Sequence, residues 1–483
     1  MGPVDNGRLR RSILLMTISA VAAPRVGAMT ASLGFAGAVT SLLHTLSMPL
    51  LPALPRLLGT SITATSWVAT VTLVAGGVST PIVGRMGDLY GKRRMALACL
   101  WVALAGSVCS ALAPSLPMLL VGRLLQGLAL GVIPLSLGIL RDTLDAERLQ
   151  RQVAVLSVFM LGLGTGFGPL LVAGLLDAAG WHAVFWGAAA LSAAALVLVA
   201  RFVEPSPLRA PARFDVVGAV GLSATLVLLL VGITRGGEWG WTSPAIVGLL
   251  GGAAVLGWSW VRWEVGRDAP LVDLATARRR PVLIAHGAGV MVGFATFAQY
   301  LAAFSLVALP AATGYGFGGS PFVAGLTQVP AAAVGLFAAP VAERVLAAGG
   351  PRRLLTVGSV TVATGFAAGV VWHAALWEIA VSAALVYFGV GLAYCALPLL
   401  VMSNVPMADT AAANAVNNLS RVFGSVIAAA VASAILAAAV HGVAGGRHPA
   451  HWAYVAIYLL GAAAAGATAA LARALPAGAT ATR

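Results

Sequence analysis

Residues 67–113 read WVATVTLVAGGVSTPIVG, then RMGDLYGKRR, then MALACLWVALAGSVCSALA, so two apolar runs flank a short charged loop. Each run is close to the roughly 20 residues that an α-helix needs to cross a bilayer. The loop holds four cations and one acid, Asp88. The stretch therefore predicts two membrane-spanning helices joined by a tight polar turn.

The same pattern repeats along the whole chain. Hydrophobic residues make up 60% and charged residues 9%, with a mean hydropathy of +0.95, whereas soluble domains are about 25% charged. This composition excludes a soluble fold and predicts an all-α integral membrane protein. Asp215 is placed to cap the seventh helix. We expect about fourteen spans, near residues 28–54, 67–84, 95–113, 117–140, 152–176, 181–200, 216–234, 244–261, 281–309, 321–341, 354–373, 376–403, 412–440 and 452–472.

The positions of the basic residues explain the net charge of +14. Of the 29 lysines and arginines, three fall in loops on one side (Arg56, Arg235, Arg447) and two lie within spans (Arg123, Arg421). The remaining 29 − 3 − 2 = 24 fall on the other side. This is the positive-inside pattern. It favours a cell-membrane protein with both termini in the cytoplasm and a basic face toward anionic lipid headgroups, with no nucleic acid as partner.

The N-terminal leader, residues 1–27, has two interpretations. Arg8, Arg10 and Arg11 followed by apolar residues 12–23 resemble a signal peptide. Cleavage would place the new N-terminus outside and invert every later span, which conflicts with the arginine distribution. We therefore favour an uncleaved cytoplasmic leader that lies on the membrane surface, with a cleaved signal as the alternative.

The sequence contains no phosphate-binding loop for ATP hydrolysis and no cysteine spacing typical of a metal site. The single lysine, Lys92, is followed by Arg93, so the sequence lacks a phosphate-binding Gly-Lys-Ser/Thr loop and cannot hydrolyse ATP by that route. The three cysteines lie in apolar runs without metal-type spacing. We expect no cofactor, no metal and no enzyme activity.

The loop of residues 84–94 is the most specific signal. Gly84 and Gly91 permit a tight turn, while Asp88 lies among cations that include Lys92 and Arg93. An ordinary positive-inside loop explains the cations but neither the acid nor the glycines. The loop resembles the signature loop of the major facilitator superfamily, Gly-x-Leu-x-Asp-x-x-Gly-Arg-Lys, with Met86 in place of the leucine.

The fourth span carries a buried charge. Arg123, Gln126 and Gly127 form an Arg-x-x-Gln-Gly string, and an arginine inside a span costs about 2.5 to 3.5 kcal/mol on insertion scales. One interpretation is that Arg123 extends to the outer headgroups. The resemblance to the fourth-helix motif of the superfamily implies instead that it faces a central cavity.

The fifth span is rich in small residues. Gly164, Gly168 and Pro169 resemble the antiporter motif Gly-x-x-x-Gly-Pro-x-x-Gly-Gly of drug exporters in this superfamily, although Val172 and Ala173 replace the final glycines. Close helix packing explains much of this pattern without any function.

Together these motifs resemble the fourteen-helix drug:proton antiporter branch of the superfamily. The resemblance implies two six-helix bundles (residues 28–202 and 281–475), two additional helices with linkers (203–280) and a cytoplasmic tail (476–483). It also implies that Asp88 and the adjacent cations latch the cytoplasmic side, with Asp142 and Arg421 as partners.

The implied function is a monomeric secondary transporter that exports small amphipathic compounds by proton antiport and alternating access. A facilitator or importer of a small solute remains an alternative. A membrane-embedded enzyme or sensor would need clustered catalytic or metal-binding side chains, which the scattered intramembrane arginines and histidines do not suggest.

The positions of the acidic residues do not identify a side chain that carries the proton. None of the 15 acids lies at mid-span, and only Asp177 and Glu378 lie at outer span ends. His44 is the candidate carrier because histidine titrates near neutral pH, and a neutral hydrogen-bonded core histidine is the alternative. Because no carboxylate is expected in the cavity, we expect neutral, zwitterionic or anionic substrates. We expect aromatic side chains to line the cavity: Phe294, Phe297, Tyr300 and Tyr394.

Overall fold

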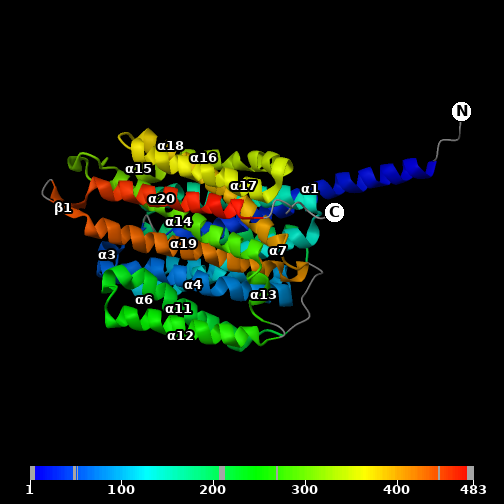
Figure 1. Ribbon diagram of the computed structural model, residues 1–483, viewed down its shortest axis with the longest axis horizontal. Helices are drawn as coiled ribbons and strands as arrows, with labels where there is room; N and C mark the ends of the chain where they lie inside the picture. Colours follow the sequence, from blue (N-terminus) through cyan, green and yellow to red (C-terminus); the bar gives the residue numbers. More distant parts are fainter. Residues whose placement is uncertain are drawn as a thin grey trace.

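The computed structural model describes residues 6–46, 50–51, 53–205, 213–267, 270–443 and 446–475. Long helices run side by side along one axis (Figure 1). We call the end at which the last helix finishes the terminal end, and the opposite end, with its two-stranded antiparallel sheet, the hairpin end. The predicted tail, 476–483, lies outside the described residues.

The helices follow the apolar runs of the sequence. The first part contains α1 (Asn6–Thr45), α3 (Leu54–Leu57), α4 (Ile62–Tyr90), α5 (Lys92–Ala111), α6 (Leu116–Leu128), η1 (Ala129–Gly131), α7 (Val132–Thr143), α8 (Ala146–Phe159), η2 (Met160–Phe167), α9 (Gly168–Ala179) and α10 (Trp181–Phe202). The middle part contains α11 (Val216–Trp239), α12 (Pro244–Val265) and α13 (Leu274–Ala277). The last part contains α14 (Arg280–Ala308), η3 (Ala311–Thr313), α15 (Pro321–Leu326), α16 (Val329–Leu336), α17 (Ala338–Val371), α18 (Leu376–Met402), η4 (Met407–Asp409), α19 (Thr410–Ala438), β1 (Val440–Val443), β2 (Gly446–Pro449) and α20 (His451–Arg473).

The number of crossings agrees with the sequence. Among the described residues, twelve helical segments are long and apolar enough to cross a membrane. One of them, Phe322–Val371, contains two crossings because Gly350 (φ 67°) breaks α17. The consecutive elements α8, η2 and α9 form one more, so twelve plus one plus one gives fourteen. The all-α membrane fold is therefore confirmed.

Some boundaries differ from the expectation. The helix α1 is continuous from Asn6 to Thr45, so it begins well before residue 28, and its first turns project beyond the bundle (Figure 1). The fifth crossing changes to a π-helix in η2, where the sequence is Gly-rich. The predicted cap is present, because the Asp215 carboxylate accepts a hydrogen bond from the Gly218 N–H at 2.9 Å.

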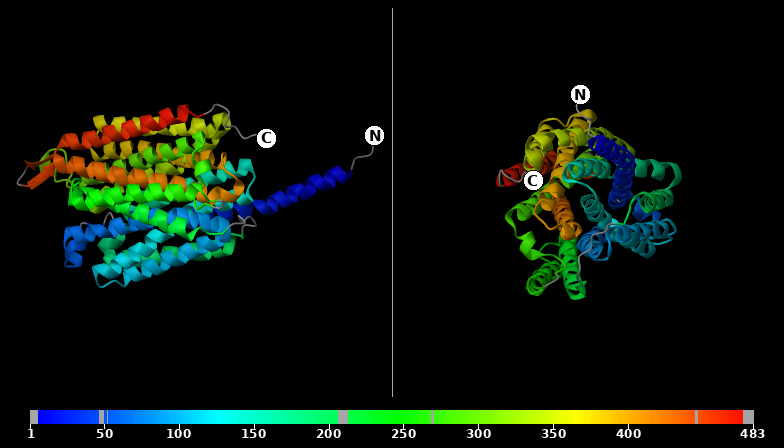
Figure 2. Two further views of the ribbon diagram at one scale, coloured as in Figure 1. Left: turned by 60° about the horizontal axis from the view of Figure 1, so that its bottom comes forward. Right: turned by 90° about the vertical axis from the view of Figure 1, so that its right-hand side faces the viewer.

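The two additional helices lie at the edge of the bundle. Figure 2 shows α11 and α12 in green on its periphery. Apolar side chains of α11 pack between α4 and α19, so this helix covers the seam where the first and last parts of the chain meet. The α12 helix is mostly exposed, as expected for a surface that faces lipid.

Arg235 lies inside α11 rather than in the loop expected from the sequence. The side chain is buried, its guanidinium carbon lies 3.9 Å from the ring centroid of Trp67, and it donates a 2.7 Å hydrogen bond to Ser66. An ion pair joins it to Glu238. These contacts offset part of the cost of burying the charge and fasten α11 to α4.

Candidate functional site

The charged loop of residues 84–94 lies at the terminal end and holds a buried ion cluster. The Asp88 carboxylate accepts hydrogen bonds from the backbone N–H groups of Ala411 (3.3 Å) and Ala412 (2.8 Å) at the start of α19. The Lys92 ammonium lies 3.3 Å from Asp88 and 2.7 Å from Asp142. We call Asp88, Lys92, Asp142 and these two N–H groups the latch cluster. It joins α4, α5 and α7 to α19, and all three charged side chains are nearly solvent-free.

Local geometry explains why the cluster forms. Gly91 has a φ of 106°, which reverses the chain between α4 and α5 and lets Lys92 return toward Asp88. A Cβ atom on Gly84 would lie 2.6 Å from Ala415 Cβ and 2.9 Å from Ala411 O, so only glycine allows α4 to approach α19 this closely. The N-terminus of α19 presents free N–H groups and a positive dipole, and both favour the Asp88 carboxylate.

A second layer of contacts, which sequence reasoning missed, surrounds the latch cluster. Arg85 forms a 2.8 Å ion pair with Asp409. Arg141 donates hydrogen bonds to Thr410 Oγ1 (2.7 Å) and the Val405 carbonyl (2.9 Å). The residue types were visible in the sequence, but nothing there indicated that segments between 264 and 324 residues apart meet.

Two predicted latch residues lie elsewhere. Arg93 donates a 2.8 Å hydrogen bond to the Ala200 carbonyl of α10, within the first part of the chain. Arg421 is not at the latch cluster, because it is eleven residues into α19 from Thr410, or about 16 Å along the helix at 1.5 Å per residue. The structure instead places it in the middle of the bundle.

A small cavity of about 130 Å³ lies between the first and last parts of the chain. Side chains from α1, α4, η1, α7, η2, α14, α18 and α19 line it: Ser41, His44, Thr45, Ala69, Leu73, Leu130, Ile133, Met160, Thr296, Phe297, Tyr300, Tyr387, Tyr394, Asn418, Arg421, Val422 and Ser425. We call this space the central cavity. Of the predicted aromatic lining, Phe297, Tyr300 and Tyr394 are present, whereas Phe294 packs in the core instead.

Arg421 carries the permanent charge of the central cavity wall. Its guanidinium carbon lies 4.4 Å from the ring centroid of Tyr394, and its Nη2 donates a 2.8 Å hydrogen bond to Asn418. No carboxylate lines the cavity in the described part of the chain. Asp177 is exposed, and Glu378 accepts hydrogen bonds from backbone N–H groups at the start of α18.

His44 lies in the last turn of α1 and lines the central cavity, toward the hairpin end. Its Nδ1 atom is buried and has no hydrogen-bond partner among the described residues.

Arg123 does not line the central cavity, contrary to the expectation from its motif. It is fully buried, and its guanidinium donates to the Leu43 carbonyl (2.9 Å) and to Gln126 Oε1 (2.6 Å). Gln126 in turn donates to Ser107 (2.9 Å). The carbonyl that Arg123 binds belongs to the residue before His44, so Arg123 connects the fourth crossing to the cavity-lining turn of α1.

Gly127 contacts the second crossing. A Cβ atom there would lie 2.6 Å from the Thr72 carbonyl oxygen, so the motif glycine allows close approach of α6 to α4. Arg123 does not extend to the outer headgroups, because its guanidinium binds groups of the protein.

The antiporter-like residues lie where η2 and α9 pack against other helices. A Cβ atom on Gly164 would lie 2.4 Å from Ser41 Cβ and 2.8 Å from the Ala38 carbonyl oxygen of α1. Gly168 and Pro169 begin α9 and are buried. On the other side, a Cβ atom on Gly325 of α15 would lie 3.4 Å from Leu170 Cα. The motif thus packs on both α1 and the last part of the chain.

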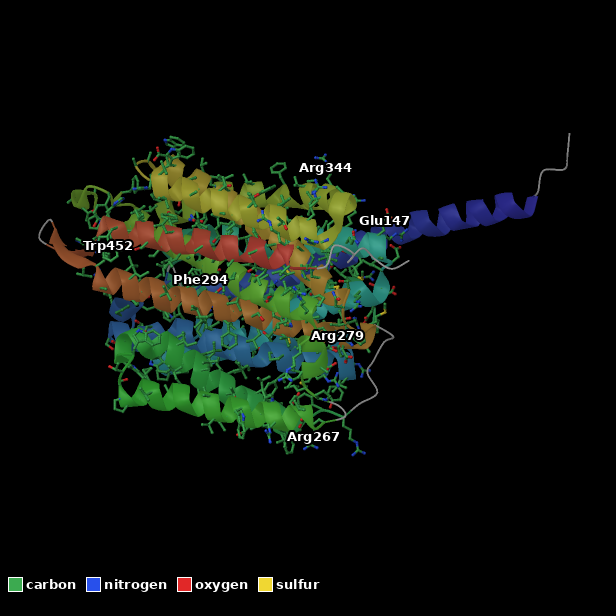
Figure 3. The ribbon with its side chains drawn as sticks, viewed as in Figure 1. Glu147, Arg267, Arg279, Phe294, Arg344 and Trp452 are labelled. Atoms are coloured by element: carbon green, nitrogen blue, oxygen red, sulfur yellow. The ribbon has the colours of Figure 1, made fainter. Side chains whose placement is uncertain are left out.

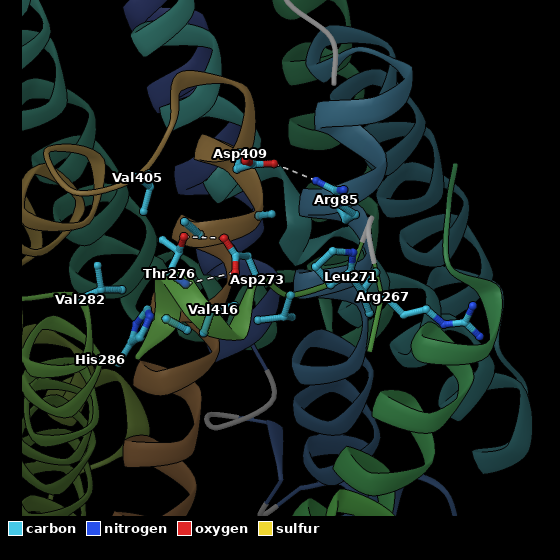
Figure 4. Close-up of a pocket in the computed structure, with 15 residues that line it drawn as sticks. Arg85, Arg267, Leu271, Asp273, Thr276, Val282, His286, Val405, Asp409 and Val416 are labelled. Atoms are coloured by element: carbon cyan, nitrogen blue, oxygen red, sulfur yellow. Dashed lines mark hydrogen bonds and ion pairs between the residues drawn. The ribbon is translucent and has the colours of Figure 1, made fainter. Parts of the chain in front are cut away.

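A larger cavity of about 410 Å³ opens beside the latch at the terminal end (Figure 4). Its wall includes Arg85, Asp409, His286, Arg267 and the segment that carries Asp273. Burial disfavours the charged Asp273 carboxylate, but hydrogen bonds from the Thr276 side chain and N–H and from the Ala275 N–H outweigh it and lower the pKa of Asp273. The linker between α12 and α14 therefore forms part of the wall.

Charged side chains gather at the terminal end. Figure 3 places Glu147, Arg267, Arg279 and Arg344 there, and Trp452 near the hairpin end. Within the described residues, no group of three or more histidine, cysteine or acidic side chains has the arrangement of a metal site.

Residues 33–429 match the family described as Major Facilitator Superfamily, which covers most of the chain. The chain belongs to the major facilitator superfamily. The chain is 29% identical over 351 residues to the multidrug resistance protein B homolog of Mycobacterium tuberculosis (strain ATCC 25618 / H37Rv), covering 71% of the chain and 63% of that protein. It is 30% identical over 322 residues to the tetracenomycin C resistance and export protein of Streptomyces glaucescens, covering 65% of the chain and 57% of that protein. The chain thus spans less than two thirds of the length of these relatives.

A solved structure has the same fold. The human organic anion transporter MFSD10 superposes with a TM-score of 0.62 at 19% identity, covering 91% of this chain and 99% of that chain. At this identity the likeness establishes the fold alone.

Proposed function

We propose that this protein is a secondary transporter that exports small amphipathic compounds by alternating access, with protons moving in the opposite direction. Two observations together carry the proposal. A central cavity lies between the two parts of the chain, and among the described residues the dense latch contacts lie at one end of the bundle only. A transporter closed on one side and able to reverse that closure needs both features.

The relatives support the direction of transport. Their names describe multidrug resistance and export of an antibiotic. Gly164 of the antiporter-like motif packs tightly on α1, and Leu170, next to Pro169, contacts α15, as expected of a crossing that keeps the two parts of the chain from leaking.

Charge distribution supports an orientation with the terminal end in the cytoplasm. The labelled arginines at that end belong to the basic majority of the chain, and the positive-inside rule places such residues on the cytoplasmic side. In this orientation the latch closes the cytoplasmic entrance and His44 lies on the outer half of the pathway.

His44 supports the proton part of the proposal. It is the titratable histidine of the central cavity wall, and its buried Nδ1 has no partner among the described residues that would fix its protonation. A carrier that exchanges its proton with solvent and substrate needs such freedom.

The test is transport by the purified protein in proteoliposomes with an imposed pH gradient. We expect an inward proton gradient to drive movement of an amphipathic compound out of the protein's cytoplasmic side, and collapse of the gradient by an ionophore to stop it. Equal movement with and without the gradient would indicate a facilitator. Higher accumulation of the compound in expressing cells than in knockout cells would indicate an importer.

A further inference from the structure

The central cavity has an unusual inventory of polar groups. Arg421, Tyr300 and Tyr387 line it and are only 5%, 6% and 3% exposed. Each has a polar atom without a hydrogen-bond partner among the described residues: Nη1 of Arg421 and the hydroxyl groups of Tyr300 and Tyr387. Buried polar groups are normally satisfied, so these three atoms indicate places for groups of a bound molecule.

Besides His44, whose Nδ1 has no partner among the described residues, the other polar side chains of the wall that the structure describes with hydrogen bonds are already occupied. Thr296 donates to the Val292 carbonyl at 2.7 Å, and Ser425 donates to the Gly293 and Arg421 carbonyls at 3.2 Å. Asn418 accepts from Arg421. A ligand would therefore meet unsatisfied donors mainly at Arg421 and the two phenols.

The charge of the site selects the ligand's charge. Arg421 has no carboxylate partner in the described part of the chain, and a buried guanidinium without a counter-charge is costly. Its stacking on Tyr394 offsets only part of this cost, because a cation–π contact contributes about 0.5 to 2 kcal/mol. An anionic group at Nη1 would supply the missing charge, whereas a cation would add to the repulsion.

The shape and lining select an aromatic body. Phe297 and Tyr300 lie with ring centroids 6.4 Å apart, and Tyr394 and Tyr387 add two more rings to the wall. A space of about 130 Å³ in this closed state suits one small fused ring system rather than a long flexible chain.

We propose that the central cavity binds planar aromatic anions, with a carboxylate or phenolate of the ligand on Arg421 Nη1, its rings among Phe297, Tyr300 and Tyr394, and a polar substituent in reach of the Tyr300 and Tyr387 hydroxyls. The assignment rests on the proposed transport function and names its substrate class. A binding measurement separates the two, because binding to the purified protein does not require transport.

The test uses a matched series of naphthalene probes on the full chain in lipid nanodiscs, followed by equilibrium dialysis and naphthyl fluorescence. The probes are 2-naphthoate (anion), its methyl ester (neutral) and 2-naphthylmethylammonium (cation). We expect the anion to bind at least about tenfold more tightly than the ester, as one charge-assisted hydrogen bond predicts, and the ammonium to bind most weakly. Acetate in excess should not displace 2-naphthoate, because it lacks the rings.

Variants then locate the anion. Arg421→Gln should reduce 2-naphthoate binding to the level of the ester and leave ester binding unchanged within about threefold. The matched control is Arg344→Gln, which removes one charge from an exposed arginine at the terminal end. It should change neither 2-naphthoate binding nor ester binding. Tyr387→Phe should weaken 6-hydroxy-2-naphthoate by about two- to tenfold, the range for a single neutral hydrogen bond, and 2-naphthoate by less.

Several results would overturn the assignment. Equal binding of acid and ester, tighter binding of the ammonium, or displacement by acetate would each contradict an aromatic-anion site, and these need only the wild-type protein. Unchanged 2-naphthoate binding in Arg421→Gln would show that the anion sits elsewhere. Selective binding without transport of any probe would leave the assignment standing and contradict the proposed transport function instead.

Discussion

Replacing Asp88 by asparagine should open the latch. Asp88 accepts two backbone hydrogen bonds from the start of α19 and faces Lys92 at 3.3 Å. Asparagine keeps one oxygen for one of the two N–H groups, but its NH₂ group faces the other N–H and the attraction to Lys92 is lost. Counting one lost hydrogen bond to a charged group, the closed state loses about 1.5 to 3 kcal/mol, which shifts the closed-to-open ratio about 10- to 150-fold.

The shift can be measured as a distance between the two parts of the chain. Arg94 and Met407, both exposed at the terminal end, are replaced by cysteines in a background without the native cysteines. Spin labels on these two cysteines report the separation of α5 and η4. We expect Asp88→Asn to move the distance distribution toward longer values and to impair transport, with nearly normal amounts of protein in the membrane.

The matched control is Asp145→Asn. This acid lies at the same end, caps α8 and forms only an exposed pair with Arg148 at 3.4 Å. Exposed pairs contribute little, so the distribution should not change. If Asp88→Asn also left the distribution and transport at wild-type values, the latch assignment would be refuted.

Three further predictions follow from the packing, the cavity and the outer layer of the latch. Gly164→Ala should lower the unfolding temperature, because overpacking against α1 costs about 1 to 3 kcal/mol. Gly174→Ala, with open space around the new methyl group, should leave the unfolding temperature unchanged or raise it, and equal effects of the two changes would show that the motif glycine has no special packing role. His44→Gln should abolish stimulation of transport by a pH gradient while substrate exchange without a gradient persists, and retained stimulation would move the proton carrier to another group. Arg85→Gln should weaken the closed state less than Asp88→Asn, because its partner Asp409 is partly solvated; a larger opening in the spin-label distances would contradict this ranking.

Much of the fold was predictable because the bilayer fixes the length of a span, so apolar runs reveal helices directly. The resemblance to the superfamily's signature loop implied that Asp88 and the adjacent cations would meet Asp142, and these side chains lie together in the structure. The N–H groups of Ala411 and Ala412 could not be, because a helix terminus binds through its backbone and leaves no side-chain signature.

The central cavity was harder to predict. Arg123 and Arg421 both lie within spans, and sequence gives their depth only roughly and their rotation about the helix not at all. Both therefore lie elsewhere than expected: Arg421 faces the cavity rather than the latch, and Arg123 ends on the Leu43 carbonyl of α1 rather than in the cavity. The unpartnered hydroxyl of Tyr387 was missed for the same reason.

The position of α11 bears on how a lipid-soluble compound could reach the cavity. Apolar side chains of this helix fill the space between α4 and α19, so on that flank acyl chains and compounds dissolved in the bilayer are kept from the seam between the first and last parts of the chain. At the other seam α9 contacts α15 directly, whereas in the described part of the chain α11 packs on α4 and α19 instead. We therefore expect compounds dissolved in the bilayer to enter the cavity from the side, along the α9–α15 flank. Gly325 packs on Leu170 there, so a bulky residue in its place should slow entry from the bilayer and leave entry from the aqueous phase unchanged.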